Sequence, residues 1–218
     1  MILKKILILA LLFSSSIWAG EFENAVAEYN KGNYVQALNT FYALAKEGDS
    51  QAQFNVALIY ANGKGVAKDH YQAMVWYEKA AQQRNCDAQY NLAKLIVQKA
   101  EKGDTHAQER AKEWYEKAAK AGQKEAMNEL ALFYVKGRGV KRDERKAFAL
   151  FKQAAQMGES SAQANVALLY AWGKEVPHNK IKAYENFKKA LAQGKNEVSS
   201  SLEKLCKESS WACQKSEE

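Results

Sequence analysis

A segment of 36 residues recurs along this chain, and the recurrence constrains the fold more than any other feature of the sequence. The segment at 122–157 is copied at 158–193, and two earlier copies occupy 48–83 and 84–121, the second of which is lengthened to 38 residues. Units of this size are single supersecondary elements that cannot bury their apolar surface alone, so they must stack on one another. The period therefore predicts stacked repeats and argues against an enzyme fold with one central core.

Each copy contains two runs of apolar residues with helical spacing, joined by a short glycine-rich link. In the first copy the apolar residues lie four apart in both runs: Ala52, Val56 and Tyr60, then Ala73, Tyr77 and Ala81. This spacing predicts two helices of about three turns. One column of the first helix is always alanine, whose small side chain allows close helix packing: Ala57, Ala93, Ala131 and Ala167. We predict an all-α fold, an α-solenoid of stacked antiparallel helix pairs that forms a right-handed superhelix.

The links between the two helices predict helix ends. Glycines at 63, 65, 137 and 139 suit left-handed backbone after a helix, and Asp69, Asp143 and Asn179 suit the N-cap of the second helix. No strand precedes these glycines, which argues against a phosphate-binding loop. The second copy departs from the pattern, with Arg84 at a glycine position and 98–102 in place of the link. We expect its first helix to run on and its turn and cap, at 103–105, to come two residues late.

The repeated motifs also resemble a known family. Ala-x-x-x-(Leu/Val)-Ala-x-x-Tyr, then Gly-x-Gly-Val, then Ala-x-x-x-(Tyr/Phe)-x-x-Ala-Ala is similar to the Sel1-like repeat, a longer-looped relative of the tetratricopeptide repeat. The resemblance covers 48–193 in four copies. On this interpretation, 20–47 is an N-terminal capping tetratricopeptide-like repeat and 194–218 is a C-terminal capping helix and tail. The resemblance implies a scaffold that binds proteins without a cofactor.

The first 19 residues have the pattern of a secretory signal peptide. Lys4 and Lys5 precede the uncharged run 6–13, and the small residue Ala19 stands where a signal peptidase would cut. A retained membrane anchor is the alternative, but the apolar run is shorter than the ~20 residues that a spanning helix needs. We therefore expect cleavage, no membrane span in the mature chain, and a periplasmic or secreted protein.

Three cysteines remain after the leader, in what export would make an oxidising compartment. Cys206 and Cys213 lie seven residues apart, near the end of the last predicted helix. We predict a disulfide between them that staples this helix to the tail. Cys86 is left unpaired, and we expect a free thiol there.

Charge and titratable residues favour protein binding over nucleic-acid binding or catalysis. The formal net charge is +7, two units of which lie in the leader, and Lys and Arg alternate with Glu along the helices. This pattern is typical of a solvated helix surface, not of a nucleic-acid interface. His70, His106 and His178 occupy different columns, which disfavours a metal site. We predict no catalytic, cofactor-binding or metal-binding residues, and a monomer that binds another protein or a peptide segment.

The resemblance to tetratricopeptide repeats implies that the first helices line a partner-binding groove. Its candidate residues are Phe54, Leu58, Tyr90, Lys94, Asn128, Leu132, Lys136, Leu168 and Trp172. For the three leucines, packing against the second helices remains an open alternative. We interpret Phe54, Tyr90 and Trp172 as accessible anchors, because other copies carry polar residues in the same columns.

The function expected from these features is that of an exported scaffold for protein–protein interaction. Envelope assembly, signalling, host contact and immunity against a toxin are the roles that the resemblance admits. The alternative is a secreted repeat protein that resembles a β-lactamase or binds peptidoglycan. The sequence lacks the Ser-x-x-Lys, Ser-Asp-Asn and Lys-Thr-Gly set of serine β-lactamases.

Overall fold

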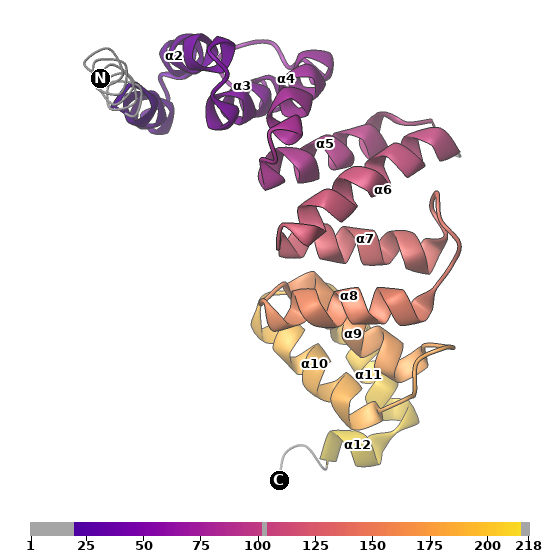
Figure 1. The fold of residues 1–218 in the computed structure, drawn as a ribbon. Coiled ribbons are helices and arrows are strands. Elements are labelled where there is room, and N and C mark those ends of the chain that lie inside the picture. The colour runs from indigo at the N-terminus through magenta and orange to yellow at the C-terminus, as the bar shows by residue number, and fades with distance from the viewer. Residues whose placement is uncertain (1–19, 102–103, 215–218) are drawn as a thin grey trace, which may run out of the picture. The chain divides into compact units, whose positions relative to one another are not determined.

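The computed structural model describes residues 20–101 and 104–214. The predicted leader, residues 102–103 of the second link and the last four residues lie outside these ranges. All regular structure within them is helical (Figure 1). The chain divides into two compact units, Met1–Leu95 and Ile96–Glu218, and each is described by itself.

The first unit contains the N-terminal helices and the first repeat. A helix runs through residues 20–30, and α2 (Tyr34–Lys46), α3 (Ser50–Asn62) and α4 (His70–Gln82) follow, with the first part of α5 (Cys86–Lys99). A tight turn at 30–33 joins the first two helices. Helix α3, the first helix of its repeat, packs on both α2 and α4. We call the first and second helices of each repeat first-type and second-type helices.

The second unit repeats this arrangement. It contains the end of α5, then α6 (Thr105–Lys120), α7 (Lys124–Lys136), α8 (Glu144–Gln156), α9 (Ser160–Trp172) and α10 (Lys180–Ala192), followed by a 3-10 turn (Asn196–Val198), α11 (Ser199–Glu208) and α12 (Ser210–Gln214). From α6 to α11 each helix packs on the next, and successive helices run in opposite directions (Figure 1). The predicted fold class, an α-solenoid of helix pairs, is confirmed. The handedness of a superhelix stays a prediction.

Small residues allow the helices of each pair to approach closely. The predicted alanine column of the first helices is completely buried, and so is a matching column of the second helices: Ala73, Ala111, Ala147 and Ala183. Phenylalanine and tyrosine side chains fill the space between these alanines, with Tyr77, Tyr115, Phe151 and Phe187 all buried. The repeat period therefore records which positions must be small and which must be large.

The predicted N-caps are confirmed. The side chains of Asp69, Asp143 and Asn179 each accept a hydrogen bond from the backbone N–H three residues on. Asp104 does the same at α6, but the expectation that this cap comes late is wrong. Ala111 lies six residues into α6, whereas the equivalent Ala73 lies three residues into α4. The inserted residues thus start α6 about one turn early, while α5 gains one residue.

The Gly-x-Gly links serve two purposes. Gly63 and Gly137 end their helices in the left-handed region, with φ of 68° and 66°. The second glycine is also left-handed, and it lies against the preceding second-type helix: a Cβ on Gly139 would lie 2.8 Å from the amide nitrogen of Glu109. The fourth copy differs, because Gly173 is extended (φ −63°, ψ 144°) and is required by its contact with the Leu169 carbonyl.

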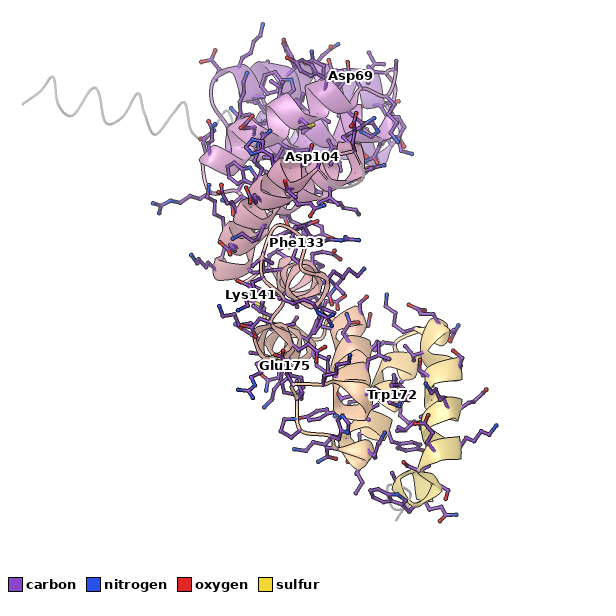
Figure 2. The ribbon with its side chains drawn as sticks, turned by 90° about the vertical axis from the view of Figure 1, so that its right-hand side faces the viewer. Asp69, Asp104, Phe133, Lys141, Trp172 and Glu175 are labelled. Atoms are coloured by element: carbon purple, nitrogen blue, oxygen red, sulfur yellow. A yellow bond between two sulfur atoms is a disulfide. The ribbon has the colours of Figure 1, made fainter. Side chains whose placement is uncertain are left out.

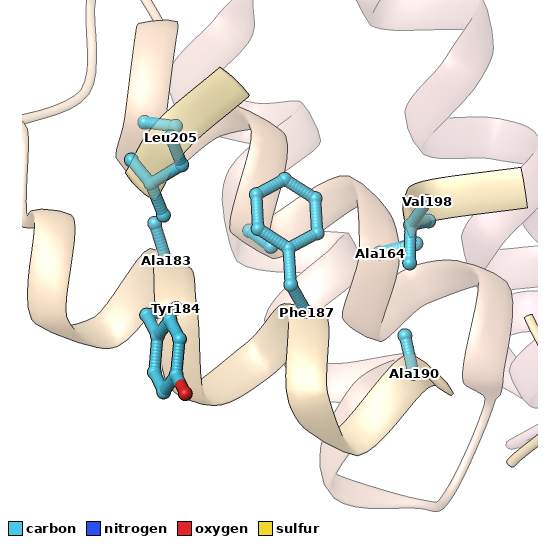
Figure 3. Packing of buried hydrophobic residues seen from close by; sticks show 9 residues of the cluster. Ala164, Ala183, Tyr184, Phe187, Ala190, Val198 and Leu205 are labelled. Atoms are coloured by element: carbon cyan, nitrogen blue, oxygen red, sulfur yellow. The ribbon is translucent and has the colours of Figure 1, made fainter. Parts of the chain in front are cut away.

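The C-terminal cap is closed by the predicted disulfide. Cys206 and Cys213 are bonded with a Cα–Cα distance of 5.7 Å, and α12 packs back on α10 and α11. Beneath it, the ring of Phe187 lies among Ala164, Val198 and Leu205 (Figure 3). Cys86 is a free, half-buried thiol, as expected.

Candidate protein-binding surfaces

The predicted groove residues fall into both compact units, so they form two surfaces that are described separately. In the first unit they lie on α3 and α5, and in the second on α7 and α9. We call the side of these helices that carries them the first-helix face. Helices α3 and α5 contribute Phe54, Leu58, Tyr90 and Lys94; α7 and α9 contribute Asn128, Leu132, Lys136, Leu168 and Trp172.

In the first unit, one of the expected aromatic anchors is partly a packing residue. The half-buried ring of Phe54 lies 5.8 Å from the ring of Tyr77 on the paired helix. Tyr77 is 2% exposed, so this contact belongs to the interior, and burial raises the pKa of Tyr77. By contrast, Lys94 is exposed and its ammonium group lies 6.0 Å from the centre of the half-buried Tyr90 ring. The accessible part of this surface is therefore centred on Tyr90 and Lys94.

The half-buried Trp172 also contacts the C-terminal cap, a role that its prediction as a groove residue did not include. Its ring lies 6.2 Å from that of Phe187, and its Nε1–H donates to the carboxylate of Glu208 at 2.9 Å. The ammonium groups of Lys180 and Lys204 lie 5.5 and 4.9 Å from the ring centre. Figure 2 labels Trp172 on the helix beside the cap. Column comparison missed this role because the residues that cover Trp172 come after the last repeat.

Asn128 is also structural. Its side chain is 5% exposed, and its Oδ1 accepts a hydrogen bond from Nδ2 of Asn165 at 3.0 Å. This bond joins α7 to α9, the first helices of consecutive repeats. A buried amide needs such partners, so Asn128 is not available to a ligand.

Three predicted residues remain accessible on the first-helix face of the second unit. Leu132 on α7 is half-buried, Lys136 at the end of α7 is exposed, and Leu168 on α9 is 37% exposed. Leu132 and Leu168 occupy the same column in consecutive copies. The exposure of Leu168 favours a surface role over packing against the second helices. The accessible residues are therefore two leucines on the first helices of consecutive repeats and a lysine at the end of α7.

Sequence reasoning missed a column of buried glutamines. Nε2 of Gln53, Gln89 and Gln163 donates to the backbone carbonyl eight residues earlier, at Ala45, Ala81 and Ala155. Each amide thereby gives a second donor to a carbonyl at the end of the preceding second helix, which also accepts from a backbone N–H. Recurrence of glutamine beside a conserved alanine in three copies was the available signal. The third copy has Met127 at this position.

Glu144 holds the link of the fourth copy against α8. Its buried carboxylate accepts from the backbone N–H groups of Lys174 and Glu175 at 2.8 and 3.2 Å, and from Nη2 of Arg142 at 3.2 Å. Burial raises the pKa of Glu144, but the amide donors and Arg142 outweigh burial and hold the pKa below its ordinary value of 4.5. The sequence offered no signal for this clamp, because the donors are backbone groups 30 residues away.

The described residues provide neither a metal-binding cluster nor a membrane-spanning helix. In residues 20–101 and 104–214, no group of three or more His, Cys, Asp or Glu side chains could hold a metal ion. A ring nitrogen of His178 lies 2.6 Å from the carbonyl oxygen of Gly173, within its own link. None of the helices in these ranges combines the length and apolar character of a membrane span.

Helix pairs with a repeated alanine–aromatic core and partly accessible first helices define an α-helical repeat scaffold. The model of the Sel1 repeat matches residues 50–85, 86–123, 124–159 and 160–195. The chain therefore belongs to the Sel1 repeat family.

Solved structures of several bacterial proteins are similar to this chain. A protective antigen of uropathogenic Escherichia coli strains, which displays the same repeat fold, is 29% identical with a TM-score of 0.82 over 95% of this chain and 46% of its own. The present chain thus spans less than half of that antigen. A Sel1 repeat protein from Oxalobacter formigenes is 30% identical, with a TM-score of 0.74 over 81% of this chain and 71% of its own.

A more distant likeness concerns the fold alone. An immunity protein from Pseudomonas aeruginosa is 20% identical, with a TM-score of 0.50 over 78% of this chain and 66% of its own. A search among curated proteins found no match.

Proposed function

We propose that this chain is an exported scaffold that holds another protein on the first-helix face of its repeats. The observation that carries the proposal is that Leu132, Lys136 and Leu168 are accessible on the first helices of the third and fourth copies. Leucines that share a column on the first helices of consecutive repeats suit an extended or helical segment that crosses both repeats. Family membership supports a scaffold as the coarse class.

Export is the second part of the proposal. The leader pattern at 1–19 motivates it, and the Cys206–Cys213 disulfide is consistent with an oxidising compartment. Intact-mass measurement of the protein from the periplasmic or culture fraction tests it. We expect a chain that begins at Gly20 and carries one disulfide. A full-length chain in the cytosolic fraction would contradict export.

Capture of the partner tests the binding surface. The tagged protein is used to capture partners from the envelope fraction, and the double variant Leu132→Glu/Leu168→Glu is compared with wild type. Met157→Glu is the matched control, because Met157 is an exposed apolar residue that follows a second-type helix. We expect the partner to be lost with the double variant and retained with the control. Retention by the double variant, with an unchanged circular dichroism spectrum, would refute this surface.

The identity of the captured protein then separates the possible roles. An envelope component supports assembly or signalling, a host protein supports host contact, and a toxin supports immunity. The fold shared with the Pseudomonas immunity protein makes immunity one of these possibilities. We expect no nitrocefin turnover above a boiled control, and turnover would favour the β-lactamase alternative.

A further inference from the structure

A second surface of the same unit contains a hollow that the first-helix face does not use. The hollow lies over α7, between the second-type helices α6 and α8, and has a volume of about 580 Å³. Met127, Leu130 and Tyr134 line it on α7, with Ala119 of α6 and Leu150 of α8 at its sides. At 100° per residue, these α7 positions lie on the side of the helix opposite Leu132. The hollow is therefore separate from the surface proposed above.

The floor of the hollow is apolar because the third copy has methionine at a position where the other copies have a hydrogen-bonded glutamine. In the other three copies the Met127 position is a buried glutamine that donates to the preceding helix. Methionine cannot make that bond, and it provides a flexible, polarisable surface that adapts to apolar ligands. The exchange has occurred in the copy whose first helix lines the hollow.

A small residue on α8 also opens the space. Ala149 lines the hollow, whereas the equivalent residues of the other second helices are larger: Val75, Glu113 and Glu185. These two differences from the other copies, Met127 and Ala149, both contribute to the hollow. One makes the floor apolar, and the other removes side-chain volume from the wall.

The rim beside this hollow is basic. An adjoining hollow of about 630 Å³ shares Tyr134 and Lys146 with the first and is also lined by Lys141, Arg142 and Arg145. The segment 136–146 carries six basic and two acidic residues, whereas the equivalent segment 62–72 carries two basic and one acidic. Figure 2 labels Lys141 in this link and Glu175, which also lines the adjoining hollow.

The nearby acidic groups are largely occupied. The carboxylate of Asp143 caps α8 by accepting from the backbone N–H of Lys146, and Glu144 is held by two backbone amides and Arg142. Glu116 on the opposite wall pairs with Lys112 at 3.5 Å. The ammonium group of Lys146 lies 3.9 Å from the carboxylate of Asp143, and Glu175 also lines the adjoining hollow. The lining still has a surplus of positive charge, because the basic residues Lys141, Arg142, Arg145 and Lys146 face only the acidic residues Asp143 and Glu175.

We propose that this hollow is a docking site for a short acidic segment of a partner protein. An apolar side chain of the segment lies over Met127 and Leu130, and its carboxylates lie against Lys141, Arg145 and Lys146. Charge complementarity selects the acidic segment, since the rim is basic and the floor is apolar. A buried apolar anchor flanked by charge-assisted contacts is a common way to bind a peptide.

Peptide display on the purified, disulfide-bonded protein tests the proposal. A library of random 12-residue peptides is selected for binding, and affinities of the enriched peptides are measured by fluorescence polarisation. We expect enriched peptides to share one aromatic or aliphatic residue flanked by at least two Asp or Glu residues. Met127→Gln and Lys146→Glu are each expected to weaken binding about tenfold, the effect of ~1.4 kcal/mol.

Matched controls separate this site from general effects. Met127→Gln introduces the residue that three other copies already carry, so the fold accommodates it. Met157→Gln makes the same exchange on the exposed surface, and Lys152→Glu makes the same charge change elsewhere on α8. Both controls should bind like wild type. Leu132→Glu should also leave peptide affinity unchanged, which distinguishes this site from the first-helix face.

Several results would overturn the proposal. These are a selection that yields no binding peptide, enriched peptides without acidic residues, and equal affinity for Met127→Gln and wild type. Vesicles of phosphatidylglycerol provide a further arm. If Lys146→Glu abolishes vesicle binding while no peptide binds, the basic rim contacts an anionic lipid surface instead.

Discussion

The third copy (124–159) and the fourth copy (160–195) share one backbone plan but differ in how much of it is covered. Both have a completely buried alanine at the helix contact, Ala131 or Ala167, and both cap the second helix with a side chain, Asp143 or Asn179. The fourth copy is closed by the disulfide-bonded cap. The third copy keeps an open hollow, an apolar floor and a basic rim.

Equivalent positions in these two copies therefore make different contacts. At the first residue of the second helix, Glu144 clamps the next link, whereas Lys180 donates to the Ala171 carbonyl and lies 4.0 Å from Glu208 of the cap. At the end of the first helix, Lys136 is exposed, whereas Trp172 packs under the cap. In a stacked fold, the next unit along the chain decides what a repeated position contacts.

The largest effect on stability should come from removing the disulfide that closes the fourth copy. Cys206→Ser/Cys213→Ser is expected to lower the free energy of unfolding by about 2–3 kcal/mol, because the short disulfide loop restricts the unfolded chain. Hydrogen exchange should show loss of protection in α10 and α11 and little change in α7. Cys86→Ser is the control and should change stability by less than about 0.5 kcal/mol. Equal loss of protection in α7 would mean that the two copies are not closed independently.

Removing the clamp between the two copies should have the next largest effect. Glu144→Gln is expected to cost about 2 kcal/mol at pH 7, because hydrogen bonds to a charged acceptor are lost. The lowered pKa means that the carboxylate stabilises the fold above pH 4.5, and this contribution disappears as pH falls through the folded-state pKa. Urea unfolding between pH 7 and pH 3 measures it. Glu185→Gln, an exposed change on α10, should show no such difference.

Exchanging glutamine and methionine between the two copies should have the smallest effect on stability. The change should be destabilising in the fourth copy and neutral or stabilising in the third. Gln163→Met removes the bond to the Ala155 carbonyl and is expected to cost about 1 kcal/mol. Met127→Gln can form the equivalent bond in the third copy, so its stability should equal or exceed that of wild type. Thermal melting of both variants checks the pair. A large loss of stability with Met127→Gln would mean that methionine is required for packing and not for an open floor.

Features that repeat with the period, or that join residues close together in the chain, could be predicted from the sequence. The alanine contacts, the caps at Asp69 and Asp143 and the Cys206–Cys213 disulfide depend on local spacing, and all are present. The clamp at Glu144 and the cap over Trp172 could not be predicted, because their partners belong to the next copy or to the segment that follows the last copy. Asn128 was misassigned for the same reason, since its partner Asn165 belongs to the next copy.

Arg84 is a further position at which the residue type alone did not predict the local structure. It stands at a glycine position, and it keeps the left-handed backbone of the other copies, with φ of 66°. The sequence marked it as a departure from the pattern, yet the local backbone is retained. Stacking therefore fixes the turn even where the residue type opposes it, at a cost of about 1 kcal/mol.

Site-specific photo-crosslinking in cells tests most directly the claim that the first-helix face of the third and fourth copies holds a protein. A photoreactive p-benzoylphenylalanine is placed at Leu168 in one strain and at Met157 in another, both exposed apolar positions of the second unit. We expect a discrete protein adduct from position 168 and none from position 157. An adduct from position 157 with none from position 168 would contradict it.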